Sequence, residues 1–177
     1  MMLRVRFGNW RFSIVLVPVI DIYGVNSKLP DGKHFLMWDM DKTDLNTIIE
    51  DLQNTQSVYN LPNIYILESN PKGGMHAYCF KRLPFRKICE ILTYTKHTDW
   101  RYLRFGMIRQ EFTLRITEKY SYRPKLIYTL HSDIPEDVSM NEMRNFCLYD
   151  AINVHKNINI DLEMRLDKEK KAIWISH

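Results

Sequence analysis

The sequence has few cysteines, the residues that form the disulfides of small secreted proteins and bind structural zinc. It contains three cysteines in 177 residues, none of them in a CxxC spacing, so neither a structural zinc site nor a disulfide framework is expected. Six glycines and seven prolines are spread along the chain, and no repeat or low-complexity tract divides it. We therefore expect a single domain over residues 1–177 in a reducing compartment.

Long hydrophobic runs are also missing. A membrane-spanning helix needs about 18 or more consecutive apolar residues, and the apolar stretch 12–22 is interrupted by Ser13, Pro18 and Asp21. The basic N-terminal segment alternates like a strand and lacks a small-residue cleavage site, so no secretion signal is expected. These features predict a cytoplasmic protein with no membrane partner.

Charge is only slightly unbalanced. The formal net charge is +4, and hydrophobic residues make up 45% of the chain. This composition is that of an ordinary globular protein. The small basic excess is compatible with a polyanionic partner and does not require one.

The patterns of apolar residues predict a mixture of strands and helices. Residues 2–19 read as two strands joined at Gly8-Asn9, and residues 29–32 form a turn before a doubly buried strand at 34–40. Further strands are expected at 63–68, 75–80, 112–116 and 124–130, with a C-terminal hairpin of 162–166 and 172–175. Helices are expected at 45–59 with Thr43 as the cap, after Pro84, and at 141–152, whereas the stretch 100–109 is ambiguous.

From residue 34 to residue 117 the expected order is strand, helix, strand, strand, helix, strand. This is the order of a split βαβ or RRM-like sheet with its helices on one face. The predicted fold is therefore α+β, with an RRM-like βαββαβ core within residues 34–130, extended by N-terminal and C-terminal strands.

A pair of carboxylates closes one of the expected strands. Asp39 and Asp41 follow the apolar run 34–38, and residues i and i+2 of a strand point to the same face. Two carboxylates so close repel each other, and a bound divalent cation would relieve that repulsion. The alternative is that Asp41 caps the next helix.

A histidine follows a small-residue turn one hairpin later. Ser69 begins the turn, Gly73 and Gly74 end it, and His76 lies on the returning strand. The glycines leave the approach to His76 uncrowded, as a phosphate-binding site requires. The alternative is a hydrogen-bonded structural histidine. Because both strands belong to one expected sheet, His76 and Asp39 are predicted to meet on its open face.

In order and spacing, these motifs resemble the archaeo-eukaryotic primase superfamily, also called primase-polymerases. That family has a DxD or DxE at the end of a strand, an SxH or SxxGxH segment at a hairpin, and a later acidic residue followed by basic positions. Here Trp38-Asp39-Met40-Asp41 is similar to the first motif and residues 68–76 to the second. The third is placed at Asp99, with Glu111 as the competing position.

The resemblance implies two-metal nucleotidyl transfer. Asp39, Asp41 and Asp99 would hold two Mg²⁺ or Mn²⁺ ions, which lower the pKa of an attacking 3′-hydroxyl and stabilise the leaving pyrophosphate. Five side chains would bind the incoming nucleoside triphosphate: Ser69, Lys72, His76, Arg109 and Arg115. For the basic residues, the alternative is a solvated strand edge.

The ambiguous stretch 100–109 interleaves aromatic and basic residues. Such a pattern can stack bases and follow a phosphate backbone. Arg101 and Arg104 are the residues that we expect to contact nucleic acid, whereas core packing is favoured for Tyr102 and Phe105.

The expected function is that of a minimal viral or plasmid primase-polymerase domain, which works on a single-stranded DNA template beside a helicase or other replication protein. One alternative is a non-catalytic replication initiator that binds single-stranded nucleic acid. Paired aspartates on the central strands argue against it, because they repel phosphate unless a metal intervenes. Another is a metal-dependent nuclease. A rolling-circle initiator ranks lower, since none of the six histidines forms a His-hydrophobic-His pair.

Overall fold

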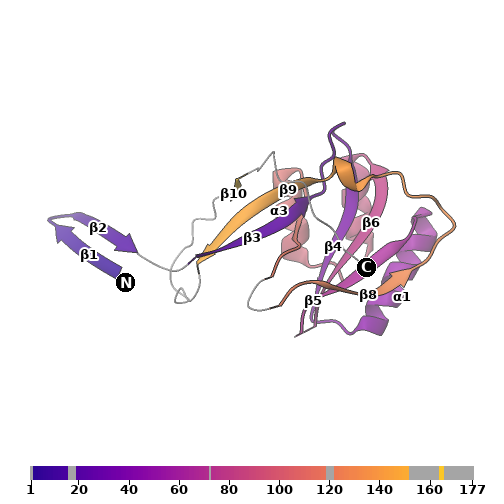
Figure 1. Ribbon diagram of the computed structural model, residues 1–177, viewed down its shortest axis with the longest axis horizontal. Helices are drawn as coiled ribbons and strands as arrows, with labels where there is room; N and C mark the ends of the chain where they lie inside the picture. Colours follow the sequence, from indigo (N-terminus) through magenta and orange to yellow (C-terminus); the bar gives the residue numbers. More distant parts are fainter. Residues whose placement is uncertain (1, 16–18, 72, 119–121, 152–163, 166–177) are drawn as a thin grey trace.

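The computed structural model describes residues 2–15, 19–71, 73–118, 122–151 and 164–165 of the chain (Figure 1). Helices and antiparallel sheets combine in it as an α+β fold, which confirms the predicted class. The helices are α1 (Leu45–Tyr59), α2 (Phe85–Tyr94) and α3 (Trp100–Arg109). The strands are β1 (Met2–Phe7), β2 (Trp10–Val15), β3 (Val19–Asn26), β4 (His34–Asp41), β5 (Ile64–Asn70), β6 (Gly74–Leu83), β7 (Thr113–Arg115), β8 (Lys125–Leu130), β9 (Arg144–Ala151) and β10 (Met164–Arg165).

The sheet that carries the candidate site has the strand order β4-β6-β5-β8. Both β4 and β5 run antiparallel to β6, so they are parallel to each other and α1 makes the crossover between them. The expected fourth strand, 112–116, does not join this sheet: β7 pairs with β3 instead, where Leu114 lies opposite the buried Val25. The fourth position is taken by β8 beside β5, so the strand order differs from the predicted RRM-like order.

The two faces of β4 have different neighbours. Trp38 points toward the helices, and its Nε1 donates a 3.0 Å hydrogen bond to Thr95 Oγ1 at the end of α2. The same hydroxyl lies 3.2 Å from Thr55 Oγ1 of α1, so α1 and α2 lie together over this face. Asp39 and Asp41, one residue out of phase with Trp38, point to the opposite face.

The outer edge of β4 is covered by the first turn of α3. The backbone N–H of Asp99 donates to the Asp39 carbonyl at 2.7 Å, and the Tyr102 hydroxyl donates to the Met37 carbonyl at 2.9 Å. These bonds satisfy carbonyl groups that an edge strand would otherwise leave open. The ambiguous stretch 100–109 is therefore a helix held against the strand of the paired aspartates.

The second four-stranded sheet, β10-β9-β3-β7, overturns one prediction. The helix expected at 141–152 is wrong: β9 pairs with β3 over eight residues from Arg144 to Ala151. Ser139 and Glu142 do form a capping box, but the helical turn after it is a single 3-10 turn, Met140–Glu142. The long pairing with β3 outweighs this local signal. Of the expected C-terminal hairpin, residues 164–165 are described, as β10 paired with β9, whereas 162–163, 166 and 172–175 lie outside the described residues.

Several local predictions hold, with shifts of one residue. β1 and β2 form a hairpin with Phe7 opposite Trp10, so Gly8-Asn9 is its two-residue turn. The cap of α1 is Asp44 rather than Thr43, because its carboxylate accepts from the Thr47 backbone N–H at 3.0 Å. Pro84 is the N-cap residue of α2 and not part of its first turn. None of the described helices has the length and hydropathy needed to cross a membrane.

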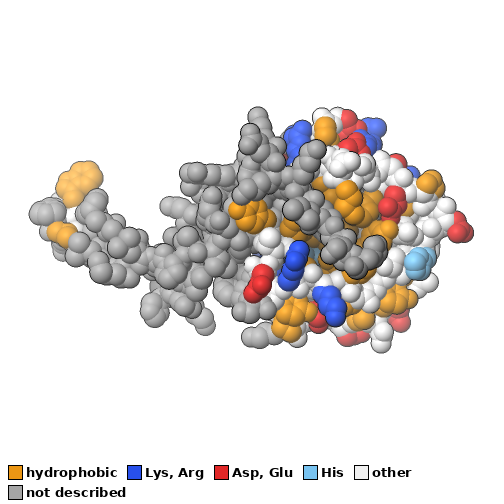
Figure 2. All heavy atoms as spheres, viewed as in Figure 1, with side chains coloured by type: hydrophobic (Ala, Val, Ile, Leu, Met, Phe, Trp, Pro, Cys, Tyr) orange, Lys and Arg blue, Asp and Glu red, His pale blue; other side chains and the backbone are white. Residues whose placement is uncertain are grey.

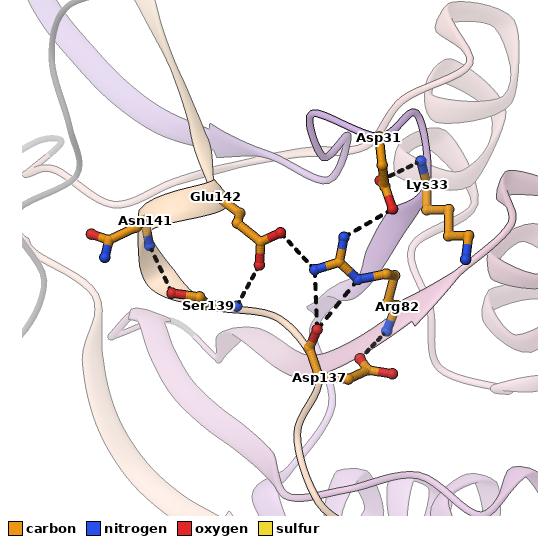
Figure 3. Close-up of polar contacts among 7 residues, drawn as sticks. All are labelled: Asp31, Lys33, Arg82, Asp137, Ser139, Asn141 and Glu142. Carbon is orange, nitrogen blue, oxygen red and sulfur yellow. Dashed lines mark hydrogen bonds and ion pairs between the residues drawn. The ribbon is translucent and has the colours of Figure 1, made fainter.

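Arg82, near the end of β6, ties the two four-stranded sheets together (Figure 3). Its guanidinium donates to Asp31 Oδ2 at 2.9 Å, to Glu142 Oε1 at 2.6 Å and to the Asp137 carbonyl at 3.1 Å. Asp31 belongs to the turn before β4, whereas Glu142 ends the 3-10 turn that leads into β9. The arginine thus links the entry to the site-bearing strand with the second sheet.

Candidate functional site

The strand register brings the two predicted motifs together. Asp39 on β4 lies directly opposite His76 on β6, and Asp41 lies opposite Gly74, so all four residues share one face. His76 Nε2 is 3.8 Å from Asp39 Oδ1. Along β4 the aspartates become more open to solvent, with Asp39 half-buried and Asp41 exposed. The site is therefore a surface carboxylate pair with an imidazole beside it.

The surroundings of Gly74 leave little room for a side chain. A Cβ there would lie 3.0 Å from Asp41 Oδ1 and 3.0 Å from Ser69 Oγ, closer than ordinary van der Waals contact. Gly73, with φ of 87°, takes a conformation that favours glycine, and its carbonyl accepts from the Lys42 N–H at 3.1 Å. The glycine turn thus packs tightly against the end of the carboxylate strand.

One of the predicted nucleotide-binding residues, Ser69, lies beside this turn. Ser69 is buried next to Gly74. Lys72 lies outside the described residues.

Its surroundings make Asp39 harder to ionise than an ordinary aspartate. Burial, together with the nearby charges of Asp41 and Asp99, raises the pKa of the Asp39 carboxyl from 3.8 to about 7. Arg115 acts in the opposite direction and lowers it. A group at this position gains most from a bound cation, because positive charge would relieve both the desolvation and the repulsion.

His76 lies behind Asp39 and is almost completely buried, with 5% of its surface exposed. Burial, aided by the charge of Arg115, lowers the pKa of its imidazole from 6.5 to about 3, so the ring is neutral at physiological pH. Its Nδ1 has no hydrogen-bond partner among the described residues. A neutral, incompletely satisfied imidazole next to a carboxylate is unusual for a residue that serves packing alone.

Asp99 comes close to the pair and has a structural task of its own. Its Oδ1 accepts from the backbone N–H groups of Arg101 at 2.9 Å and Tyr102 at 2.8 Å, so it caps the N-terminus of α3. Its backbone N–H bonds to Asp39, as described above, and its charge contributes to the raised pKa of that residue. Glu111, the competing position, follows the C-terminal end of the same helix.

Arg115 of β7 reaches the site from the second sheet. It donates to the carbonyl of Thr117 at 3.0 Å, to that of Tyr122 at 3.3 Å, and to that of Ser69. Its half-buried charge acts on both Asp39 and His76. Among the basic residues expected to bind nucleotide, Arg115 therefore acts on Asp39 through its charge, while its guanidinium is bonded to backbone carbonyls.

Two tyrosines belong to the site although the motif analysis did not assign them to it. Tyr78 follows His76 by two residues on the same face, and burial together with the charge of Asp39 raises the pKa of its hydroxyl. Tyr102 is held by its bond to Met37, and burial with the charge of Asp39 likewise raises the pKa of its hydroxyl. The position of Tyr78 could have been predicted from the sequence, since residues i and i+2 of a strand point to the same face and Tyr78 is i+2 from His76. The position of Tyr102 could not, because its contact with Met37 depends on where α3 lies.

The remaining predicted residues lie along α3. Arg101 and Arg104 are exposed, and Arg109 is exposed at the last helical position. Core packing was expected for Tyr102 and Phe105: Tyr102 does pack against the core, but the expectation is wrong for Phe105, which is exposed. At a rise of about 1.5 Å per residue, Arg109 is on the order of 15 Å along the axis from the capping Asp99. Arg109 is thus separated from the carboxylates, whereas Arg101 is adjacent to the cap.

The Asp39 and Asp41 carboxylates could hold a cation if water and substrate phosphates supplied its other ligands. No three His, Cys, Asp or Glu side chains converge as a closed metal site within the described ranges. Mg²⁺, however, is commonly bound by one or two carboxylates, with water and substrate phosphates completing its shell. Asp39 and Asp41 are such a pair, and a bound cation would relieve their mutual repulsion.

No family model, curated protein or solved structure matches this chain. The chemistry therefore has to be inferred from its own residues. Those residues are two neighbouring carboxylates at a surface, a buried neutral imidazole behind one of them, and a half-buried arginine from a second sheet.

Proposed function

We propose that this chain is a divalent-metal-dependent nucleotidyltransferase of the primase-polymerase type, which makes or extends a strand on a single-stranded DNA template. The observation that carries the proposal is the register of β4 and β6, which sets Asp39 and Asp41 beside each other and opposite His76 and Gly74. The raised pKa of Asp39 adds an electrostatic reason for a cation there. The order and spacing of the sequence motifs, and the convergence of Asp39, Asp41 and His76 in the sheet, thus all support the family resemblance.

Each residue has a distinct task in this proposal. Asp39 and Asp41 hold Mg²⁺ or Mn²⁺, and Asp99 positions the start of α3 against them. When bound, the cations lower the pKa of the attacking 3′-hydroxyl and stabilise the charge of the leaving pyrophosphate. Arg115 contributes positive charge toward the triphosphate, and the neutral His76 offers a hydrogen-bonding imidazole behind Asp39.

The fold supports the proposal through the five elements from β4 to α2. From β4 to α2 the chain follows the βαββα order of an RRM-like core, and β6 lies between β4 and β5 as that core requires. The departure lies in the fourth strand, where β8 stands beside β5. In this proposal the domain acts in the cytoplasm, in replication of a viral or plasmid genome, next to a helicase or other replication protein.

The direct test is synthesis on a single-stranded template with Mn²⁺ or Mg²⁺ and nucleoside triphosphates. The near-isosteric variants Asp39→Asn and Asp41→Asn are expected to reduce product formation by about a hundredfold or more, since metal charge is worth several kcal/mol in the transition state. The matched control is Glu50→Gln, which removes an exposed carboxylate from α1 and should leave synthesis unchanged.

The same assay separates the alternatives. Template binding without product, in protein that is folded and supplied with metal, would support a non-catalytic initiator. Shortening of the template that depends on Asp39 and Asp41 would support a nuclease.

A further inference from the structure

Helix α3 has an exposed surface that the proposed chemistry does not use. Two rows of side chains with i, i+4 spacing run along it. Trp100, Arg104 and Ile108 form the first row, and Arg101, Phe105 and Arg109 form the second; all six residues are exposed. Trp100 is 60% and Phe105 52% exposed, which is unusual for large aromatic side chains.

The charge of this surface has one sign. The sequence from Trp100 to Arg109 contains three arginines and no aspartate or glutamate. In contrast, the face of the molecule seen in Figure 2 carries charged side chains of both signs among hydrophobic ones. A uniformly basic surface with solvent-facing aromatic rings is complementary to a polyanion that also offers flat apolar faces.

Aromatic and basic side chains are neighbours both between the two rows and within the second row. The guanidinium of Arg101 lies 5.7 Å from the Trp100 ring, and that of Arg109 lies 5.8 Å from the Phe105 ring. A helix that lies in a membrane interface separates its apolar face from its basic face, whereas here arginine and apolar residues alternate in both rows. Alternation instead suits a strand whose bases and phosphates alternate in the same way.

We infer that the exposed rows of α3 bind single-stranded nucleic acid, with Trp100 and Phe105 stacking on bases and Arg101, Arg104 and Arg109 contacting phosphates. Single strands are favoured over duplex because only unpaired bases present their faces to aromatic side chains. The inference deepens the proposed function, since α3 begins at Asp99, whose N–H is bonded to Asp39. A strand held on α3 would therefore lead toward the carboxylates.

The test measures binding in the absence of synthesis. Anisotropy of a labelled deoxythymidine homopolymer is recorded with Asp39→Asn/Asp41→Asn protein at several salt concentrations, so the result does not depend on catalysis. Adding Trp100→Ala with Phe105→Ala should weaken binding by about tenfold or more, as expected for lost base stacking. Adding Arg101→Ala with Arg104→Ala should reduce the slope of log affinity against log salt by about 1.4, for two phosphate contacts on a single strand.

Matched controls use the same residue types elsewhere. Trp10, 83% exposed in the separate β1-β2 hairpin, and Arg86, exposed on α2, should each be replaceable by alanine without effect. The inference is overturned if both α3 variants bind the homopolymer as tightly as their parent, or if duplex DNA competes equally with it. It is also overturned if the α3 variants lose binding to anionic phospholipid vesicles and not to the homopolymer. Failure of synthesis alone would count against the proposed function and leave α3 binding intact.

Discussion

The backbone N–H of Asp99 donates a 2.7 Å hydrogen bond to the carbonyl of Asp39, which joins the start of α3 to the strand that carries the carboxylate pair. The side chain of Asp99 simultaneously caps α3 through the backbone of Arg101 and Tyr102. One residue thus connects the site, the helix and its exposed basic surface. Any role of Asp99 as a metal ligand has to be separated from this capping role.

Two substitutions at Asp99 make that separation. Asn caps helices as well as Asp, so Asp99→Asn should keep the stability of the wild type, whereas Asp99→Ala should lower the free energy of unfolding by about 1 kcal/mol. Because the capping role survives in Asp99→Asn, we expect it to retain most of the synthetic activity. A folded but inactive Asp99→Asn variant would instead identify the carboxylate as a ligand. Chemical denaturation and the template assay measure the two effects.

Opposite pH dependences are expected from Asp39 and His76. The folded-state pKa of Asp39 is raised to about 7, by burial and then by Asp41 and Asp99, so its contribution to stability is present below 3.8 and is lost as pH rises toward 7. The folded-state pKa of His76 is lowered to about 3, mainly by burial, so its contribution is present above 6.5 and is lost as pH falls toward 3. Between these limits the two effects largely cancel in the wild type.

Single substitutions should expose the two contributions. Between pH 4 and pH 6, the stability of Asp39→Asn relative to the wild type should rise by up to about 1.4 kcal/mol per pH unit, while that of His76→Gln should fall by a similar amount. Urea denaturation at several pH values measures both trends. Groups that titrate alike in variant and wild type cancel when the two free energies of unfolding are subtracted. Parallel trends in the two variants would contradict the electrostatic description of the site.

How far the sequence predicts the site depends on how local each contact is. The pairing of Asp39 with His76 could be predicted, because both lie on strands of one compact βαββ segment with clear turn signals. Arg115 was expected to bind phosphate because of the family resemblance, but its position depends on β7 pairing with β3 in a different sheet. Tyr102 could not be placed, since its hydroxyl reaches Met37 only once α3 lies along the edge of β4.

The fold shows the same division between local and long-range information. The hairpin at Gly8-Asn9, the buried strand β4 and the helix α1 follow from short patterns, and the structure confirms them. The region 141–152 was predicted to be helical from a local pattern, yet its residues pair with β3, more than a hundred positions earlier in the chain. Such pairing has no signature within a short window, so tertiary contacts outweigh propensity there.

Gly106 offers a test of how α3 is held. A Cβ at this position would lie 2.1 Å from Cε1 of Phe112, and the Phe112 ring packs at 5.1 Å from that of Tyr102. Glycine to alanine in a helix normally stabilises by about 1 kcal/mol, but overpacking here should reverse the sign and destabilise by about 1–3 kcal/mol. Thermal denaturation measures the change, and adding Phe112→Leu should restore part of the loss. A stabilised Gly106→Ala variant would contradict the close packing of α3.

Metal binding should be visible as stabilisation that requires the carboxylate pair. A ligand at a hundred times its dissociation constant adds about 2.7 kcal/mol to the free energy of unfolding, so Mn²⁺ or Mg²⁺ should raise the melting temperature of the wild type and of Glu50→Gln alike. Asp41→Asn should lose this effect, because it removes one of the two carboxylates at the site.

The stabilisation should also depend on pH. A cation competes with the proton on Asp39, whose pKa is about 7, so apparent Mn²⁺ affinity should increase from pH 6 to pH 8. Electron paramagnetic resonance of free Mn²⁺ measures that affinity directly. If Asp41→Asn binds Mn²⁺ as tightly as the wild type, or if affinity is the same on both sides of pH 7, the cation is held elsewhere. The Asp39 and Asp41 pair would then have no catalytic assignment, and the raised pKa of Asp39 would reflect its burial and the charges of Asp41 and Asp99 without a role for a cation.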